Sequence, residues 1–379
     1  MKLEFGFGKG IQTVELPEDN LMGVLTANTV EYDLTGEDEV ERALAEPIGA
    51  PKLEEVVKPG EKIAIVTSDI TRPCPTWQIM PALLRHLYAA GVKREDITLV
   101  FALGSHRHHT PEEMQHLAGD LAYNEITCVD SNPDDCINLG VTKSGTPVDI
   151  TRVVAEADRR ICLANIEYHY FAGYSGGAKS IMPGVSNRAA IQSNHSMMVR
   201  PEAHAGRLAG NPIREDIEEA AAICGIDYIV NVVLDEHKQI IKAVAGDVTA
   251  AHRAGCAFLD TLYRKEIAKK ADIVLADLPC SGLGVLRKKR DLKYRMTPEQ
   301  QQELVRLQRE ILSVVWRYVK PGGTLIYSTC TVHKEENEGN TRWFLTQFPF
   351  ILKEQVQMLP GVDPWDGFYM AKMERRWND

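Results

Sequence analysis

The chain has 379 residues, a formal net charge of −10 and a hydrophobic fraction of 44%, a composition typical of a globular protein with room for two domains. Its start, MKLEFGFGKG, lacks the apolar stretch of a secretory signal. No apolar run approaches the roughly 18 residues that a membrane helix needs. The eight cysteines include no C-x-x-C pair, which argues against a zinc ribbon or a redox pair. We therefore expect a cytoplasmic protein with no membrane partner.

Charge is unevenly distributed along the chain. Residues 273–379 carry 16 Lys and Arg against 13 Asp and Glu, with RKKR at 287–290, whereas the preceding part is strongly acidic. A short basic run is usually a solvated face, and it can also hold phosphates. The first part has the charge balance of an acidic enzyme. The mildly basic second part is compatible with a nucleic-acid partner.

The predicted elements of the first part alternate between strands and helices. In chain order we expect strands at 3–7 and 11–16, a helix at 36–46, a strand at 62–67, a helix at 77–90, a strand at 96–103, a helix from 110, strands at 125–129 and 161–166, a helix at 213–224, strands at 226–234 and 239–244, possible partners in a hairpin, and a helix at 249–270. Such alternation favours an α/β fold with a largely parallel sheet.

Polar residues follow two of these strands. Asp69 and Arg72 come after the strand at 62–67, and His106, His108 and His109 come after the strand at 96–103. Ligands of open α/β sheets bind at the carboxyl ends of strands, so both loops are candidate substrate contacts, and a histidine there is a candidate base. The alternatives are an Asp–Arg pair that only ties down its loop and a surface histidine cluster.

The segment 167–195 contains two imidazoles and an amine close to a glycine-rich loop. It contains His169, Gly176, Gly177, Lys179 and His195. The glycines permit close backbone approach to a ligand, the lysine could form a covalent link or hold an anion, and the second imidazole could bind a metal. A phosphate-binding NTPase loop is disfavoured, because Met-Pro-Gly at 182–184 interrupts the helix that this loop must open.

The second part contains a strand at 272–277, a helix at 297–318, a turn at 320–323, a strand at 324–328, a helix at 334–348 and a strand at 368–372. Cys280 and Cys330 each follow a strand. Neighbouring parallel strands would place both thiols over one cleft, which favours a functional role over buried structural cysteines.

Residues 1 to about 275 resemble the nickel-pincer lactate racemase family. The resemblance rests on SDITRP at 68, GSHR at 104, YHYFAGYSGGAKSIMPG at 168, NH at 194 and GNPIR at 210. In that family a pyridinium mononucleotide with two thiocarboxyl groups binds nickel. By match, Lys179 would tether this cofactor through a thioamide, with Gly176 and Gly177 beside it, and His195 would be the nickel ligand from the protein.

The same resemblance implies a reaction. His106 and His169 would be the acid–base pair, and Asp69 and Arg72 would hold the substrate site together. The α-hydrogen of a 2-hydroxy acid is weakly acidic, so its removal as hydride by an electron-poor ring is easier and leaves a planar 2-oxo acid. Hydride can return to either face, and a histidine on each side can move the hydroxyl proton. The expected activity is racemisation or epimerisation of lactate or a related 2-hydroxy acid.

Residues from about 273 to the C-terminus resemble the RsmB-type ribosomal RNA 5-methylcytosine methyltransferases. The motifs are DLPCSGLGVLRKKRD at 277, VKPGGTLIYSTCT at 319, EENE at 335 and DGFYMAK at 366. The resemblance implies that Cys330 attacks C6 of cytosine, that Cys280 assists release and that Asp277 holds the base edge. It also implies S-adenosylmethionine as cofactor and RNA as partner.

Together the two resemblances predict a hybrid. Residues 1–272 would form a Rossmann-like, largely parallel α/β catalytic domain, and residues 273–379 a second, partial Rossmann-like unit of methyltransferase type. The first expectation is a racemase whose turnover is impaired because the second domain of its family is replaced. The alternatives are an S-adenosylmethionine-dependent methyltransferase fragment that uses Cys330, and an inactive fusion.

Overall fold

The computed structural model describes residues 2–7, 10–15, 26–265, 270–286, 296–363 and 366–377. The chain divides into two compact units, residues 27–264 and residues 1–26 with 265–379. The boundary that the motifs place at 272/273 remains a proposal. The basic run at 287–290 lies outside the described residues. Across the described helices, none is long and apolar enough to span a membrane.

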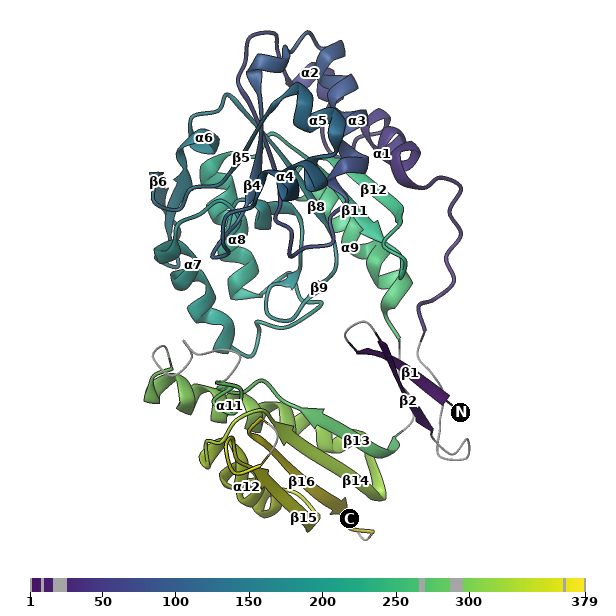
Figure 1. Cartoon of the computed structure of the whole chain (residues 1–379), viewed down its shortest axis with the longest axis vertical. Helices are drawn as coiled ribbons and strands as arrows, with labels where there is room; N and C mark the ends of the chain where they lie inside the picture. Colours follow the sequence, from purple (N-terminus) through teal and green to yellow (C-terminus); the bar gives the residue numbers. More distant parts are fainter. Residues whose placement is uncertain are drawn as a thin grey trace. The chain divides into compact units, whose positions relative to one another are not determined.

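The unit of residues 27–264 is built on a six-stranded sheet (Figure 1). Its order is β12 (Ile240–Gly246), β11 (Tyr228–Leu234), β8 (Arg159–Asn165), β3 (Ile63–Ser68), β4 (Ile97–Ala102) and β5 (Thr127–Asp130). All neighbours are parallel except β11 and β12, which form the antiparallel hairpin that the sequence allowed. All of these strands except the edge strand β5 are mostly buried on both faces, as expected for a parallel sheet covered by helices. The predicted α/β fold with a largely parallel sheet is therefore confirmed.

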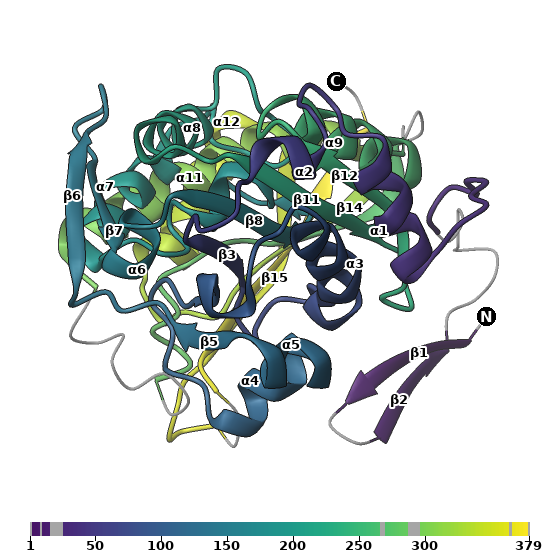
Figure 2. The same ribbon diagram turned by 90° about the horizontal axis from the view of Figure 1, so that it is seen from above.

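Helices cover the two faces of this sheet in separate groups (Figure 2). One core contains side chains of α1 (Gly36–Ala45), α2 (Leu53–Val56), α3 (Thr76–Ala89), α4 (Pro111–Ala118) and α5 (Asp120–Glu125). The other contains side chains of α6 (Arg152–Ala155), α7 (Arg188–His195), α8 (Pro212–Cys224) and α9 (Ala250–Tyr263). Successive side chains of β3 point to opposite faces of the sheet and so belong to different cores: Ile65 packs in the first and Val66 in the second.

Two helix starts are fixed by their own sequence. Thr110 caps α4 in a capping box with Glu113, as the Thr-Pro-Glu-Glu pattern predicts. Asn211 caps α8, where its Oδ1 accepts from the backbone N–H groups of Ile213 and Arg214 at 3.1 and 3.2 Å. The second cap fixes the side from which Arg214 leaves the helix.

The second unit contains a four-stranded sheet of order β13 (Ala271–Asp277), β14 (Val319–Thr329), β16 (Phe368–Arg375) and β15 (Phe350–Met358). Only β13 and β14 are parallel. Helices α11 (Pro298–Val315) and α12 (Asn340–Gln347) contribute Leu312 and Phe344 to its core. On the outermost strand, Ile273 and Leu275 are 61% and 74% exposed, which fits an incomplete sheet. The separate hairpin β1 (Lys2–Phe7) and β2 (Gly10–Glu15) matches the first two predicted strands.

Some element predictions were wrong. The turn expected at 320–323 lies within the bounds of β14. The helix expected at 334–348 is confirmed, as the π-helical turn Glu335–Gly339 followed directly by α12. Strand β15 and the hairpin β6 (Cys136–Val141) and β7 (Pro147–Thr151) were not predicted. Helix α9 ends at Tyr263, earlier than expected. The remaining short elements are β9 (Tyr168–His169), β10 (Gly173–Tyr174) and the 3₁₀ turns Arg94–Asp96, Gly177–Ser180, Ser196–Val199 and Trp316–Tyr318.

Candidate functional site

A cavity of about 400 Å³ opens at the carboxyl ends of β3, β4 and β8. Its lining includes all but one of the residues predicted for the racemase site: Asp69, Arg72, His106, His169, Gly176, Lys179 and His195. Gly177 is the exception. Residues from three loops that are far apart in the sequence therefore converge where parallel sheets bind ligands.

Asp69 and His106 form a hydrogen-bonded pair in this cavity. The buried carboxylate of Asp69 lies 2.6 Å from Nδ1 of His106 and accepts the Thr71 hydroxyl at 2.9 Å. A carboxylate only accepts, so Nδ1 of His106 carries a proton, and in the neutral form of the ring Nε2 has the lone pair. The arrangement is that of an oriented general base.

Arg72 is exposed at the cavity wall. Its backbone N–H donates to the Asp69 carbonyl at 3.1 Å, which makes the turn after β3. Among the described residues its guanidinium has no ion pair, so the alternative of an Asp69–Arg72 side-chain pair that ties down the loop is wrong. An available guanidinium in a polar cavity is suited to bidentate binding of a carboxylate.

His169 and Lys179 contact each other on another side of the cavity. Nε2 of His169 lies 3.2 Å from Nζ of Lys179, and Nδ1 accepts from the Ala172 backbone N–H at 3.2 Å. Burial, with the charges of Lys179 and Arg72, lowers the pKa of His169 to about 3, so the ring is neutral at pH 7. Since Nδ1 is an acceptor, the proton of the neutral ring sits on Nε2, from which it donates to the lysine amine when that amine is uncharged.

The environment of Lys179 favours this uncharged form. Burial, followed by the charges of Arg72 and Arg214, lowers the pKa of Lys179 to about 7, against the pull of Glu167. The neutral amine therefore predominates above about pH 7. A desolvated lysine near other cations is a pattern found in nucleophilic lysines.

His195 lies at the end of α7 and also lines the cavity. Burial and the charge of Lys179 lower the pKa of His195 to about 4, against a small opposing effect of the Ile191 carbonyl. Its Nδ1 is buried, and the Ile191 carbonyl acts on the ring, so Nε2 is the nitrogen left for a metal. A neutral imidazole held through its other nitrogen is a suitable metal ligand.

Gly176 and Gly177 shape the loop that leads to Lys179. Both have positive φ, and a Cβ on Gly176 would lie 2.8 Å from Oδ1 of Asn231. A Cβ on Gly177 would lie 2.9 Å from the His252 ring, so this glycine contacts the protein interior and not the cavity. The loop ends in a single 3₁₀ turn, Gly177–Ser180, which confirms that the NTPase-loop alternative does not apply.

The other two histidines of the cluster serve the loop itself. His109 is buried, with Nδ1 2.6 Å from Asp130, and its Nε2 accepts from the Ile70 backbone N–H at 3.1 Å. His108 is exposed and lies 3.1 Å from the same carboxylate. Neither histidine lines the cavity, so His106 alone of the three is a site candidate.

Several cavity residues were not predicted, namely Ser68, Asn165, Tyr170, Phe171, Ser180 and Met198. Ser68 and Asn165 end β3 and β8, so the strand-end rule could have found them. Tyr170 stacks on His169 at 5.0 Å between ring centroids, and Phe171 meets His195 edge-to-face at 4.9 Å. The aromatic residues hold two of the predicted imidazoles in place.

In the second unit, the two cysteines lie together after parallel neighbours β13 and β14, as predicted. Sγ of Cys280 is 3.3 Å from Sγ of Cys330. The hydrogen bond between them, with burial, raises the pKa of Cys280. Asp277 accepts the Ser328 hydroxyl at 2.9 Å. The three residues matched to the methyltransferase site are thus at the carboxyl ends of adjacent strands.

Comparison with known proteins reproduces the division into two regions. The model of the lactate racemase N-terminal domain matches residues 7–206, and the model of the 16S rRNA methyltransferase RsmB/F matches residues 229–374. The second match begins in β11, inside the first sheet. The first match covers more than half of the chain.

Individual relatives agree with these matches. The lactate racemase of Lactiplantibacillus plantarum is 38% identical over 267 residues, 69% of this chain and 63% of its own length, so the chain spans less than two thirds of that relative. The structure of the lactate racemase apoprotein from Thermoanaerobacterium thermosaccharolyticum superposes with a TM-score of 0.66 at 27% identity, over 89% of this chain and 90% of that one. The ribosomal RNA small subunit methyltransferase B of Klebsiella pneumoniae is 40% identical over 115 residues, 28% of this chain and 27% of its own. The chain belongs to the lactate racemase N-terminal domain family, and its C-terminal region matches the RsmB/F methyltransferases.

Proposed function

We propose that the chain racemises or epimerises lactate or a related small 2-hydroxy acid, using a nickel-pincer nucleotide tethered to Lys179. The observation that carries the proposal is the convergence of six side chains on one cavity: Asp69, Arg72, His106, His169, Lys179 and His195. Each has the chemical character that its proposed role needs. A cytoplasmic location is part of the proposal.

The residues present fit the cofactor. Lys179 is held in a form able to attack an activated thiocarboxyl group, and His195 offers a neutral imidazole at the cavity wall. Gly176 brings backbone to the cavity without a side chain. When bound, the cofactor would supply the hydride acceptor, because no side chain can take hydride.

The chain's own residues would bind the acid and move its proton. The guanidinium of Arg72 would pair with the substrate carboxylate. Nε2 of His106, oriented by Asp69, would take the hydroxyl proton. On the other side of the substrate, Nε2–H of His169 would donate a hydrogen bond to the oxygen of the 2-oxo acid. When hydride returns, the imidazolium of His106 would give its proton back to that oxygen, so that both rings end in their neutral forms.

The activity test is chiral analysis of lactate. The full chain, produced in a host that makes the pincer cofactor, would be incubated with pure D- or L-lactate, and both enantiomers would be measured over time. We expect each enantiomer to approach an equal mixture, at a low rate because residues 273–379 replace the second domain of the racemase family. Loaded protein that converts neither lactate nor related 2-hydroxy acids would contradict the proposal.

A second candidate function is supported by the cysteine pair. The 3.3 Å approach of Cys280 and Cys330 beside Asp277 suits covalent attack on a cytosine ring by one thiol and assistance by the other. S-adenosylmethionine and RNA would then be its cofactor and partner. We rank it second because the matched segment covers little more than a quarter of a full methyltransferase.

This candidate predicts a covalent complex with RNA that contains 5-fluorocytosine, in the presence of S-adenosylmethionine. Cys330→Ser should lose the complex, whereas Cys136→Ser, a half-buried thiol in the other unit, should retain it. Electrophoresis under denaturing conditions would detect the complex. A wild-type chain that forms none and binds no S-adenosylmethionine would exclude this activity, and failure of both tests would leave the inactive fusion.

A further inference from the structure

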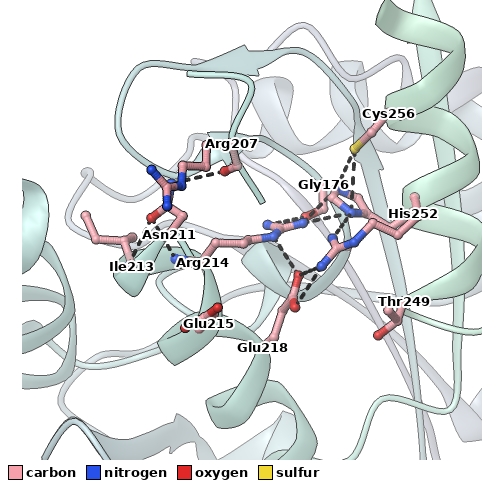
Figure 3. A network of polar contacts seen from close by, with 12 residues as sticks. Gly176, Arg207, Asn211, Ile213, Arg214, Glu215, Glu218, Thr249, His252 and Cys256 are labelled. Atoms are coloured by element: carbon pink, nitrogen blue, oxygen red, sulfur yellow. Dashed lines mark hydrogen bonds and ion pairs between the residues drawn. The ribbon is translucent and has the colours of Figure 1, made fainter. Parts of the chain in front are cut away.

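Buried side chains of three elements hold the loop that precedes Lys179. Arg214 of α8 donates from Nη1 to the Gly176 carbonyl at 3.4 Å (Figure 3). Nε2 of His252, from α9, lies 2.8 Å from the Ser175 carbonyl. Oδ1 of Asn231, on β11, accepts from the Gly177 backbone N–H at 2.7 Å. Successive peptide groups of the loop are therefore bonded to the protein interior.

Arg214 is 1% exposed, which is unusual for a guanidinium. Its Nε donates to Glu218 at 2.8 Å, and its Nη2 lies 2.8 Å from Nδ1 of His252. A guanidinium is costly to bury unless its hydrogen bonds are made inside the protein. A buried arginine that donates to the carbonyl of a ligand loop therefore points to a positional role.

His252 connects this arginine to the loop. Burial and the charge of Arg214 lower the pKa of His252 well below its usual value, so its ring is neutral. Nη2 of Arg214 lies 2.8 Å from both ring nitrogens, so the other contacts decide the tautomer. Nδ1 also faces the Arg253 guanidinium, at 3.2 Å, and is the acceptor, whereas Nε2 faces the Ser175 carbonyl. The proton of the ring is then on Nε2, from which it donates to the Ser175 carbonyl.

The loop leaves no space between itself and these side chains. A Cβ on Gly177 would lie 2.9 Å from the His252 ring, and a Cβ on Gly176 would lie 2.8 Å from Asn231. Two residues after this contact, Lys179 leaves the loop with its amine 3.2 Å from His169. The direction of the lysine is thus determined by how the loop sits on α8 and α9.

We propose that Arg214 and His252 are positioning residues: by holding the carbonyls of Gly176 and Ser175, they keep Lys179 aimed at His169 in the cavity. This proposal rests on the proposed function only where it takes Lys179 to be the attachment point of the cofactor. Neither residue touches the cavity, so both act through the loop. Arg253 provides a matched control, because it binds Glu218 and His252 and makes no bond to the loop.

The test measures the surroundings of the Lys179 amine in the cofactor-free full chain. Trace acetylation with acetic anhydride, followed by peptide mass spectrometry, gives the labelling of Lys179 against the exposed Lys143 as a function of pH. Each acetylation joins the amine to one acetyl group and releases acetate and a proton. The charged and titratable groups that act on Lys179 are Arg72, Arg214, Glu167, His169 and His195, and only Arg214 is altered directly by the variants below.

In the wild type we expect a labelling midpoint near pH 7. Arg214→Met and His252→Ala should each raise it by about one unit or more, because a displaced amine regains water. His252→Gln should keep a midpoint near the wild type, since its amide can still donate to Ser175, and Arg253→Met should leave it unchanged. Thermal unfolding of each variant reports whether it folds. If Arg214→Met does not fold, the labelling midpoint of His252→Ala tests the proposal.

A shift in Arg214→Met alone would mean that Arg214 acts only through its charge, and it would overturn the proposal, because His252 is neutral. Equal shifts in all variants, Arg253→Met included, would also overturn it, and so would wild-type Lys179 that titrates like Lys143. Normal titration combined with no cofactor adduct in the loaded chain would instead contradict the proposed function and leave this inference standing.

Discussion

Lys179→Ala is expected to abolish the covalent cofactor adduct and reduce racemisation to background. The amine is the proposed point of attachment, and no other lysine lines the cavity. We expect a stability change of only about 1 kcal/mol, because the substitution also removes the cost of burying an amine. Intact mass and chiral lactate analysis of protein from the cofactor-producing host measure the two losses.

The matched control is Lys143→Ala, which removes a highly exposed lysine of the same unit. It should keep both the adduct and the activity. In the wild type, adduct formation should rise as pH approaches about 7 and then level off, since a lowered amine pKa makes the neutral nucleophile predominant above that value. An adduct that persists in Lys179→Ala would refute the assignment of the tether.

Asp69→Asn is expected to lower the turnover number about 10²- to 10⁴-fold, the range associated with loss of general acid–base catalysis. The asparagine amide would donate to Nδ1 of His106, which moves the imidazole proton to Nε2 and removes the lone pair that takes the substrate proton. His106→Asn should show a similar loss. Steady-state kinetics in both directions measure the effect.

His108→Asn is the control from the same loop. His108 contacts Asp130 outside the cavity, so its replacement should leave turnover within about twofold of the wild type, as is usual for an exposed site away from the chemistry. Equal loss in both variants would mean that Asp69 acts by holding the loop together. Asp69→Asn with unaltered turnover would remove His106 from the role of oriented base.

Much of the fold of residues 27–264 could be predicted because its signals are local. Short apolar runs separated by helical patterns predicted the parallel strands. Thr110 and Asn211 are N-cap residue types, and helices α4 and α8 begin directly after them. The second unit was harder. Strand β15 alternates weakly and carries exposed polar residues. The Pro-Gly-Gly that suggested a turn lies inside β14 as an irregularity, where pairing with β13 passes from Val319 directly to Thr324.

The site could be predicted residue by residue but not as a set of bonds. Sequence placed Asp69 and Arg72 in one loop and suggested their pairing, whereas the carboxylate pairs with His106 from the next loop. The proton position on His169 depends on the Ala172 backbone N–H, a contact that no periodicity reveals. In the sequence Arg214 is marked only as the last residue of the GNPIR motif, and His252 lies without any mark in the helix expected at 249–270. Their bonds to the loop carbonyls of Gly176 and Ser175 exist only because α8 and α9 pack beside that loop.

The central claim is that the cavity lined by Lys179 and His195 takes up a nickel-pincer nucleotide. The most direct test is intact mass with nickel analysis of the full chain from a host that makes this cofactor. We predict a mass increase that maps to Lys179, together with about one nickel per chain, as expected for a single tethered site. A folded chain that carries neither the added mass nor nickel under those conditions would contradict the account.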